Sequence, residues 1–138
     1  MRNFDNLVNI AKSLKKDNQT GQAFHCAFAL KGGVILEIAS NQYYKSNAIS
    51  YTYAPTKKNG ANYTAGIHAE IAITGKLKYR KDMSDITLVL IRIDNNGNIA
   101  TSEPCANCAY QLGKLDFRRI IYSTNCGSFK KFPSISNN

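Results

Sequence analysis

The sequence predicts an α/β domain in which a central mixed sheet of four to five strands lies between helices, as a three-layer α-β-α sandwich. Apolar residues recur at helical spacing in some segments and form short continuous runs in others, and the two kinds of segment alternate along the chain. The 138 residues suffice for one domain, so we expect residues 1–138 to fold as a single unit. Because 43% of positions are hydrophobic and only 20% are charged, the composition excludes a disordered chain.

The first half of the chain predicts a helix and then a β-hairpin. Apolar residues at helical spacing indicate an amphipathic helix over residues 4–16. Two apolar runs, 24–30 and 34–39, flank residues 31–33, where two glycines provide the positive φ that a tight turn needs. Residues 41–65 have no period and hold five of the eight tyrosines, so we expect a long loop with a function.

Two helices and two strands are predicted in the second half. A helix over 66–78 precedes the aliphatic run 86–93, which is typical of a strand buried on both faces. A third helix is expected over 104–115, because proline is tolerated at a first helical position and Ser102 or Glu103 can cap it. Residues 119–123 read as a fourth strand, and any fifth strand is short.

Charge and cysteine content limit the classes of partner and the cellular compartment. Eighteen Lys and Arg against nine Asp and Glu give a net charge of +9, which favours anionic partners. No run of 18 apolar residues is present, so we expect no membrane span, and the N-terminus lacks the apolar centre of a secretory signal. We therefore expect a cytoplasmic protein, in which two cysteines three residues apart indicate a metal site rather than a disulfide.

Three residues form a candidate zinc site. Cys105 and Cys108 lie one turn apart at the start of a predicted helix, where the positive helix end favours the thiolates that bind metal. His68 adds a third ligand and leaves the fourth position of a tetrahedral zinc open. An open position that water can fill is typical of a catalytic zinc, so we expect one Zn²⁺ per chain.

Glu70 lies beside this site and is the candidate catalytic residue. Zinc lowers the pKa of its bound water towards 7, and Glu70, two residues from a ligand, is placed to take a proton from that water. The joint pattern of His68-Ala69-Glu70 and, about 35 residues later, Pro-Cys-x-x-Cys is typical of the zinc enzymes that deaminate nucleobases.

These motifs resemble those of the cytidine deaminase-like superfamily, in particular its CMP/dCMP-type deaminase domain, over nearly the whole chain. Residues 32–41 are similar to the second strand of the family, which ends in an asparagine that contacts the sugar. His68-Ala69-Glu70 matches the first zinc motif. Residues 101–109 match the second, in a Glu-Pro-Cys form similar to that of tRNA adenosine deaminases, and residues 117–123 resemble the strand that follows.

The resemblance implies a cytidine deaminase-like sandwich and a set of roles. The implied zinc ligands and proton shuttle are the residues named above: His68, Cys105, Cys108 and Glu70. Asn41 is expected to touch the ribose or its phosphate, although it is also the kind of residue that closes a strand. Ala69 is included among the expected substrate contacts. Phe24 and His25, at the start of the first strand, either wall the base pocket or pack in the core.

Two departures from the family leave the substrate open. The chain has a truncated C-terminus, because only residues 125–138 follow the fourth strand where nucleic-acid-editing relatives carry a further helix and strand. The loop 41–65 is longer than in the simplest members, and its tyrosines and lysines either stack bases or form a lid packed by its own rings.

Three functions are therefore considered. The first is hydrolytic deamination of a cytosine-type base, on cytidine, deoxycytidine or a nucleotide, to give the uracil form and ammonia, as an enzyme of nucleotide metabolism. The alternative is a nucleic-acid deaminase acting on tRNA adenosine or single-stranded cytosine, with weak binding through the basic loop 41–65. The third is a catalytically silent module that holds zinc and binds a partner. The resemblance also implies a homo-oligomer.

Overall fold

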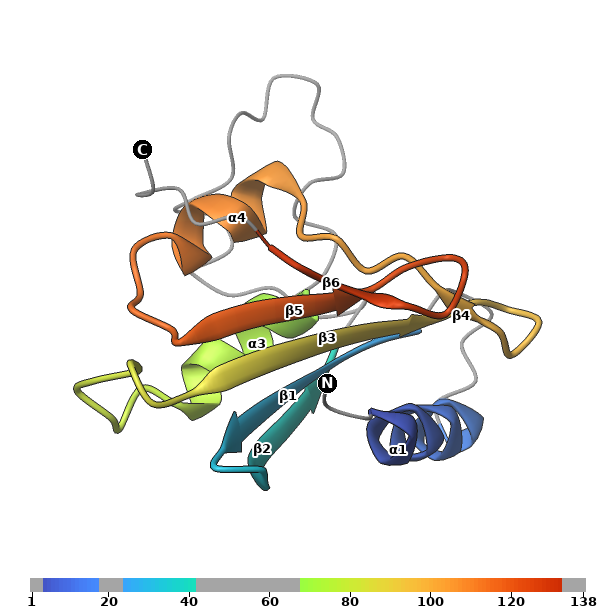
Figure 1. Ribbon diagram of the computed structural model, residues 1–138, viewed down its shortest axis with the longest axis horizontal. Helices are drawn as coiled ribbons and strands as arrows, with labels where there is room; N and C mark the ends of the chain where they lie inside the picture. Colours follow the sequence, from blue (N-terminus) through green and yellow to red (C-terminus); the bar gives the residue numbers. More distant parts are fainter. Residues whose placement is uncertain (1–3, 18–23, 42–67, 133–138) are drawn as a thin grey trace.

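The computed structural model describes residues 4–17, 24–41 and 68–132 (Figure 1). Its elements, in chain order, are α1 (Asp5–Asp17), β1 (Phe24–Lys31), β2 (Val34–Ser40), α3 (Ala69–Lys76), β3 (Thr87–Ile93), β4 (Ile99–Ala100), α4 (Ala106–Leu112), β5 (Arg119–Ser123) and β6 (Phe129–Lys131). Except for Asn41, the predicted tyrosine-rich loop lies outside these residues. No described helix is both long and apolar enough to span a membrane.

One mixed sheet organises the described part of the chain. Its strands run in the order β2-β1-β3-β5-β6, and the short β4 pairs with the end of β3. β3 and β5 are parallel, whereas the β1–β2, β1–β3 and β5–β6 pairs are antiparallel. The mixed sheet was predicted, but the described residues form six strands rather than four to five. The additional strand is β4, whose two residues are too few to show a period in the sequence.

Helices cover both faces of the sheet and make the three layers that the sequence predicts (Figure 1). Successive side chains of β1 point to opposite faces of the sheet, as the pleat of a strand requires. Phe24, Cys26 and Phe28 belong to the core under α1. Ala27 and Ala29 belong to the core on the opposite face, together with apolar residues of α3 and α4. β1 and β3 are thus buried on both sides, which explains why their sequences read as continuous apolar runs.

The predicted hairpin is present, and its turn explains the glycine pair. Gly32 has φ of 58° and Gly33 has φ of 86°. Positive φ at both central residues is the requirement of a type I′ turn, the two-residue connection whose twist matches that of the strands. The turn therefore sets the register in which Lys31 pairs with Val34.

The helix that carries the cysteines begins later than predicted. We expected it to start at Pro104 under a cap from Ser102 or Glu103. Instead Cys105 is the N-cap, with an extended backbone at φ −74° and ψ 172°, and α4 follows it. The preceding helix, α3, likewise starts directly after His68, whose φ of −71° and ψ of 153° are also extended. Both expected metal-binding segments therefore lie at helix N-termini.

Candidate active site

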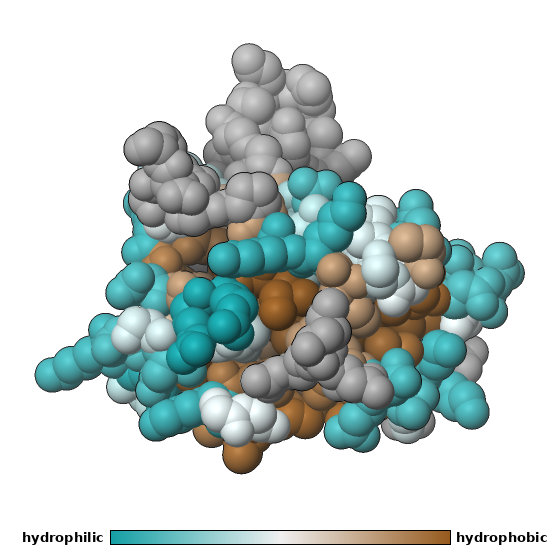
Figure 2. Space-filling view, viewed as in Figure 1, coloured by the Kyte–Doolittle hydropathy of each residue, from teal (hydrophilic) through white to brown (hydrophobic). Residues whose placement is uncertain are grey.

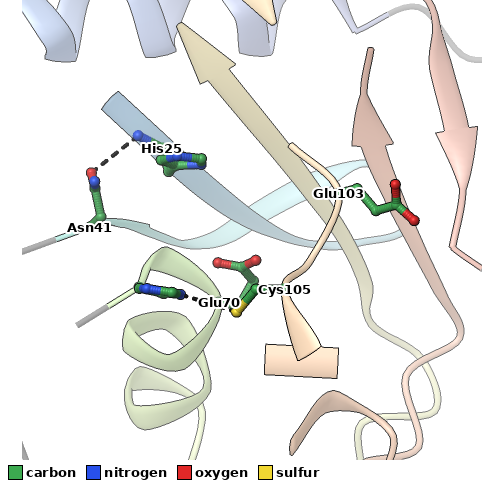
Figure 3. A pocket seen from close by; sticks show the side chains of 6 residues that line it. His25, Asn41, Glu70, Glu103 and Cys105 are labelled. Carbon is green, nitrogen blue, oxygen red and sulfur yellow. Dashed lines mark hydrogen bonds between the residues drawn. The ribbon is translucent and has the colours of Figure 1, made fainter. Parts of the chain in front are cut away.

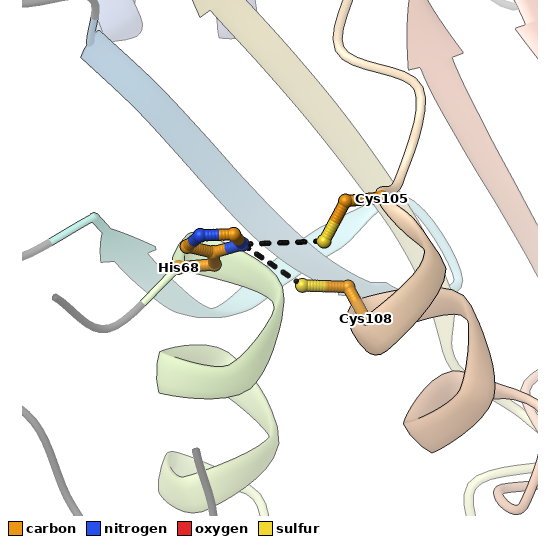
Figure 4. A group of neighbouring side chains, drawn as sticks. All are labelled: His68, Cys105 and Cys108. Carbon is orange, nitrogen blue, oxygen red and sulfur yellow. Dashed lines mark hydrogen bonds between the residues drawn. The ribbon is translucent and has the colours of Figure 1, made fainter. Parts of the chain in front are cut away.

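Three potential metal ligands converge between the N-termini of α3 and α4 (Figure 4). The Nδ1 atom of His68 lies 3.2 Å from the Cys108 sulfur and 3.5 Å from the Cys105 sulfur. The three ligand atoms all lie within 4.8 Å of one another. The structure thus brings together residues that are separated by 37 and 40 positions in the sequence.

The geometry and the chemistry of this group fit zinc. In a tetrahedral site with bonds of about 2.0 Å to nitrogen and 2.3 Å to sulfur, neighbouring ligand atoms lie about 3.3–3.8 Å apart. The nitrogen–sulfur distances of 3.2 and 3.5 Å are close to that range. Cys108 is fully buried, but His68 and Cys105 are exposed, so the group is open on one side. One nitrogen and two sulfurs with an open side match the ligand set of a catalytic zinc.

The first turn of α4 explains why the sulfurs of the two cysteines lie at the same place. The Ala109 N–H donates to the Cys105 carbonyl at 2.8 Å, which closes the first turn of α4 and places Cys108 one turn above the N-cap. Ile71 of α3 packs against Cys108 and joins the two helices. A hydrogen bond with the Cys108 thiol, together with one to His68, lowers the pKa of Cys105 to about 4. Cys105 is therefore a thiolate at neutral pH, which is the metal-binding form.

Glu70 is a buried carboxyl next to the three ligands. It lies in the first turn of α3, with 7% of its surface exposed. Burial raises its pKa to about 7, against the opposing effects of a backbone hydrogen bond and of His68. A carboxyl group with a pKa near neutrality can both accept and return a proton, which is what general acid–base catalysis requires.

A cavity of about 260 Å³ joins Glu70 to the candidate ligands (Figure 3). The described residues that line it are His25, Asn41, His68, Glu70, Glu103 and Cys105. Because β1 and β2 are antiparallel, the start of β1 and the end of β2 lie at the same end of the sheet, and residues of both line the pocket at the N-terminus of α3. Five of the residues predicted for the site thus share one pocket.

His25 and Asn41 are joined to each other at the rim of this pocket. The His25 N–H donates to the Asn41 side-chain oxygen at 3.1 Å, and the Asn41 N–H donates to the His25 carbonyl at 3.1 Å. Asn41 thus closes β2 and also lines the pocket, so its role at the strand end does not keep it away from the site. Burial, and secondarily the charge of Arg92, lower the pKa of His25 to about 4, so its ring is neutral at physiological pH.

Two residues predicted as substrate contacts do not line the cavity. Phe24 is 5% exposed and packs in the core under α1, on the opposite face of the sheet from the pocket. Neighbouring residues of a strand point to opposite faces, so His25 and Phe24 cannot both wall the same pocket. Ala69 is 2% exposed and belongs to the core between α3 and the sheet. For Phe24, core packing is therefore the alternative that the structure supports.

Two residues near the site were missed by sequence analysis. Glu103 was expected only as a helix cap, but it lines the pocket. Its position, two residues before Cys105, could have indicated that it lies near the site. Arg92 of β3 lies directly opposite His25 in the register of the sheet, and its Nε is buried without a hydrogen-bond partner in the described structure. Nothing in the sequence predicts this pairing, because it depends on strand register.

Comparisons with known proteins support the fold. No protein-family model and no curated protein matches the sequence. Among solved structures, the chain is similar to the crystal structure of a dCMP deaminase from the cyanophage S-TIM5 in complex with dCMP and dUMP. The TM-score is 0.50 at 16% sequence identity, over 84% of this chain and 76% of that chain. The predicted cytidine deaminase-like fold is therefore confirmed.

Proposed function

We propose that this protein is a zinc-dependent hydrolase that deaminates a cytosine-type base, on a nucleoside or a nucleotide, and releases ammonia and the uracil form. The proposal rests chiefly on the convergence of His68, Cys105 and Cys108 beside the buried carboxyl of Glu70. A structural zinc site needs four protein ligands and no buried acid. Three ligands with an open side and a neighbouring proton carrier suit catalysis instead.

The chain's own residues account for binding and proton transfer. When bound by the Nδ1 of His68 and the two sulfurs, zinc would supply hydroxide at neutral pH for addition to C4 of the base. Glu70 holds the proton taken from water and delivers it to N3 of the ring. It then takes the second proton, from the hydroxyl added at C4, and passes it to the departing amino group as the C4–N bond breaks. Water and the amino-substituted base are thereby converted into ammonia and the oxo base, and Glu70 returns to its starting state.

The substrate is proposed to be a small nucleoside or nucleotide. The cyanophage enzyme of similar fold was solved with dCMP and dUMP, which supports a nucleotide for this pocket too. Asn41 is the proposed contact to the ribose or its phosphate, and the neutral ring of His25 offers one donor and one acceptor to the ligand.

A substrate panel tests this proposal. Zinc-loaded protein is incubated with cytidine, deoxycytidine, CMP, dCMP, adenosine, guanine, tRNA and single-stranded DNA, and ammonia and the base product are measured. We expect uracil products from the small cytosine compounds. Deamination confined to tRNA or single-stranded DNA would favour the nucleic-acid alternative. Bound zinc without ammonia from any substrate would favour a silent binding module.

The substitution Glu70→Gln separates chemistry from metal binding. It removes the proton carrier but no candidate ligand, so zinc content should stay unchanged while turnover falls by at least about 100-fold. Glu37→Gln, in β2 and outside the described lining of the pocket, is the matched control and should retain turnover. Near-normal turnover of Glu70→Gln would assign the proton transfer to another group.

A further inference from the structure

A second cavity lies at the opposite end of the sheet, and we propose that it binds the phosphate group of a small anion. Its volume is about 200 Å³, and residues that line it include Gly32, Gly33, Asp85, Thr87, Arg118 and Arg119. None of these residues lines the candidate active site, so the proposal is independent of the proposed deaminase activity.

The topology of the sheet builds this cavity. Thr87, the first residue of β3, is in register with Arg119, the first residue of the parallel strand β5. β1 runs antiparallel to β3, so its turn at Gly32-Gly33 reaches the same end. The active-site end is marked by the His25–Arg92 pair, five residues along β3, or about 17 Å away. A phosphate here is therefore not that of a nucleotide whose base lies beside Glu70.

The charges of the cavity favour an anion. In the described part of the chain, the guanidinium groups of Arg118 and Arg119 have no hydrogen-bond or ion-pair partner. The one carboxylate in the lining, that of Asp85, is already paired with two cations that lie outside it, Arg80 at 2.8 Å and Lys31 at 3.3 Å. The two arginines of the lining are thus left with their positive charge, since Asp85 is already balanced by other cations. The planar fork of an arginine matches the oxygens of phosphate.

The backbone contributes further donors and a rigid frame. The amides of Gly32 and Gly33 donate to no group among the described residues, and successive free amides in a turn form a concavity suited to anions. The Arg118 N–H donates to the Ile86 carbonyl at 2.9 Å, which fixes the start of β5 against β3. The arginine side chains therefore extend from a fixed backbone.

Size and surface restrict the ligand class. A cavity of about 200 Å³ has room for orthophosphate, for pyrophosphate or for the phosphate end of a larger molecule. Figure 2 shows strongly hydrophilic side chains gathered on the molecular surface over the starts of β3 and β5, beside apolar surface. Gly32, Gly33 and Arg118 are exposed, so the site is accessible from solvent.

Binding is tested by amide NMR spectra of the zinc-loaded protein during titration with orthophosphate, pyrophosphate and a short oligothymidylate. We expect saturable shifts of the Gly32, Gly33 and Arg119 amides with pyrophosphate. Arg118→Gln combined with Arg119→Gln should weaken binding by at least about tenfold, since each charge-assisted hydrogen bond contributes more than a neutral one. The spectrum of the double variant reports whether it is folded.

Controls distinguish a site from general attraction. Lys130→Gln combined with Lys131→Gln removes the same charge from exposed residues of β6 and should change affinity less than about twofold. Arg119→Lys, which keeps the charge but loses the fork, should give an intermediate affinity. Equal weakening by both double variants, absence of saturation, or binding of oligothymidylate without binding of either small phosphate would overturn the proposal.

Discussion

Cys105 and Cys108 have different surroundings although one helical turn separates them. Cys105 is exposed and lines the pocket, whereas Cys108 is fully buried against Ile71. The hydrogen bond between the two thiols lowers the pKa of Cys105, and the same bond together with burial raises the pKa of Cys108. Without metal, only one of the two is therefore a thiolate at neutral pH. Binding of zinc would release the proton of the other, which makes affinity for the metal depend on pH.

Metal content is the direct test at the level of single residues. The purified protein should contain about one zinc per chain, because three protein ligands and water complete one tetrahedral site. Cys105→Ala combined with Cys108→Ala should abolish this content after dialysis, as measured by plasma mass spectrometry. Cys126→Ala is the matched control, since Cys126 is an exposed cysteine away from the candidate ligands and should leave zinc bound. Retention of zinc by the double variant would contradict the assignment.

His25 should titrate at unusually low pH. The chain has two histidines, so His68→Asn leaves the His25 ring as a single NMR reporter. Burial is the main cause of its lowered pKa, and we expect no titration above about pH 5.5 and an inflection near pH 4. Arg92→Gln removes the second cause and should move the inflection upward. A normal inflection near pH 6.5 would mean that the ring is solvated.

The lowered pKa of His25 makes the stability of the protein depend on pH. In the unfolded chain His25 takes up a proton near pH 6.5, whereas the folded protein resists protonation until about pH 4. The unfolded state therefore binds more protons in this window, and the contribution of His25 to the free energy of unfolding is lost as the pH falls from 6.5 towards 4.

At the scale of elements, the sequence was most informative where burial imposes a pattern. β1, β3 and the hairpin turn follow the predictions to within one residue, because two-sided burial requires continuous apolar runs and the turn requires glycine. The start of α4 was wrong by two residues, because proline and polar residues permit a helix start at several neighbouring positions. β4 was missed, because pairing with β3 rather than its own sequence makes it a strand.

Two glycines allow a matched test of these elements. Gly32 in the hairpin turn and Gly75 in α3 both have room for a methyl group, since no atom lies within 4 Å of an added Cβ. They differ in backbone conformation, because Gly32 has φ of 58°. Gly32→Ala should lower the free energy of unfolding by about 1 kcal/mol, and Gly75→Ala should raise it by about 0.5–1 kcal/mol. Denaturant unfolding measures both, and equal effects would contradict the type I′ turn.

The site as a whole could be predicted only in part. His68, Glu70, Cys105 and Cys108 were predicted as neighbours, and the structure brings them together. Local spacing explains only why the members of each motif lie within one turn at the start of a helix, whereas the meeting of the two motifs was predicted from their joint resemblance to zinc deaminases. The sequence could not predict that His25 faces the pocket while Phe24 faces the core under α1. A strand that is buried on both faces is compatible with either residue on either side. Glu103 lines the pocket because of the path of the chain after β4, and Arg92 lies beside His25 because of the register of β3. Neither feature leaves a local pattern in the sequence.

The ligands also couple metal binding to the stability of the whole molecule. His68 precedes α3 and the cysteines lie at the start of α4, so one ion would cross-link two helices. Among the described residues, Ile71 of α3 and Cys108 of α4 form a small buried cluster with Ala72 at its edge, and both helices also contribute residues to the core on this face of the sheet. A ligand that binds only the folded state stabilises it by about 4 kcal/mol at a thousandfold excess over Kd.

Chelation should therefore lower the melting temperature. For a domain of this size we expect a fall of at least about 5 °C when zinc is removed by a chelator, with recovery when zinc is restored. Differential scanning calorimetry provides the measurement. Cys105→Ala combined with Cys108→Ala should melt at the temperature of the metal-free protein and respond to neither treatment. An unchanged melting temperature for the wild-type protein, despite measured loss of zinc, would mean that packing alone holds α3 and α4 in place, and that the ion serves chemistry without supporting the fold.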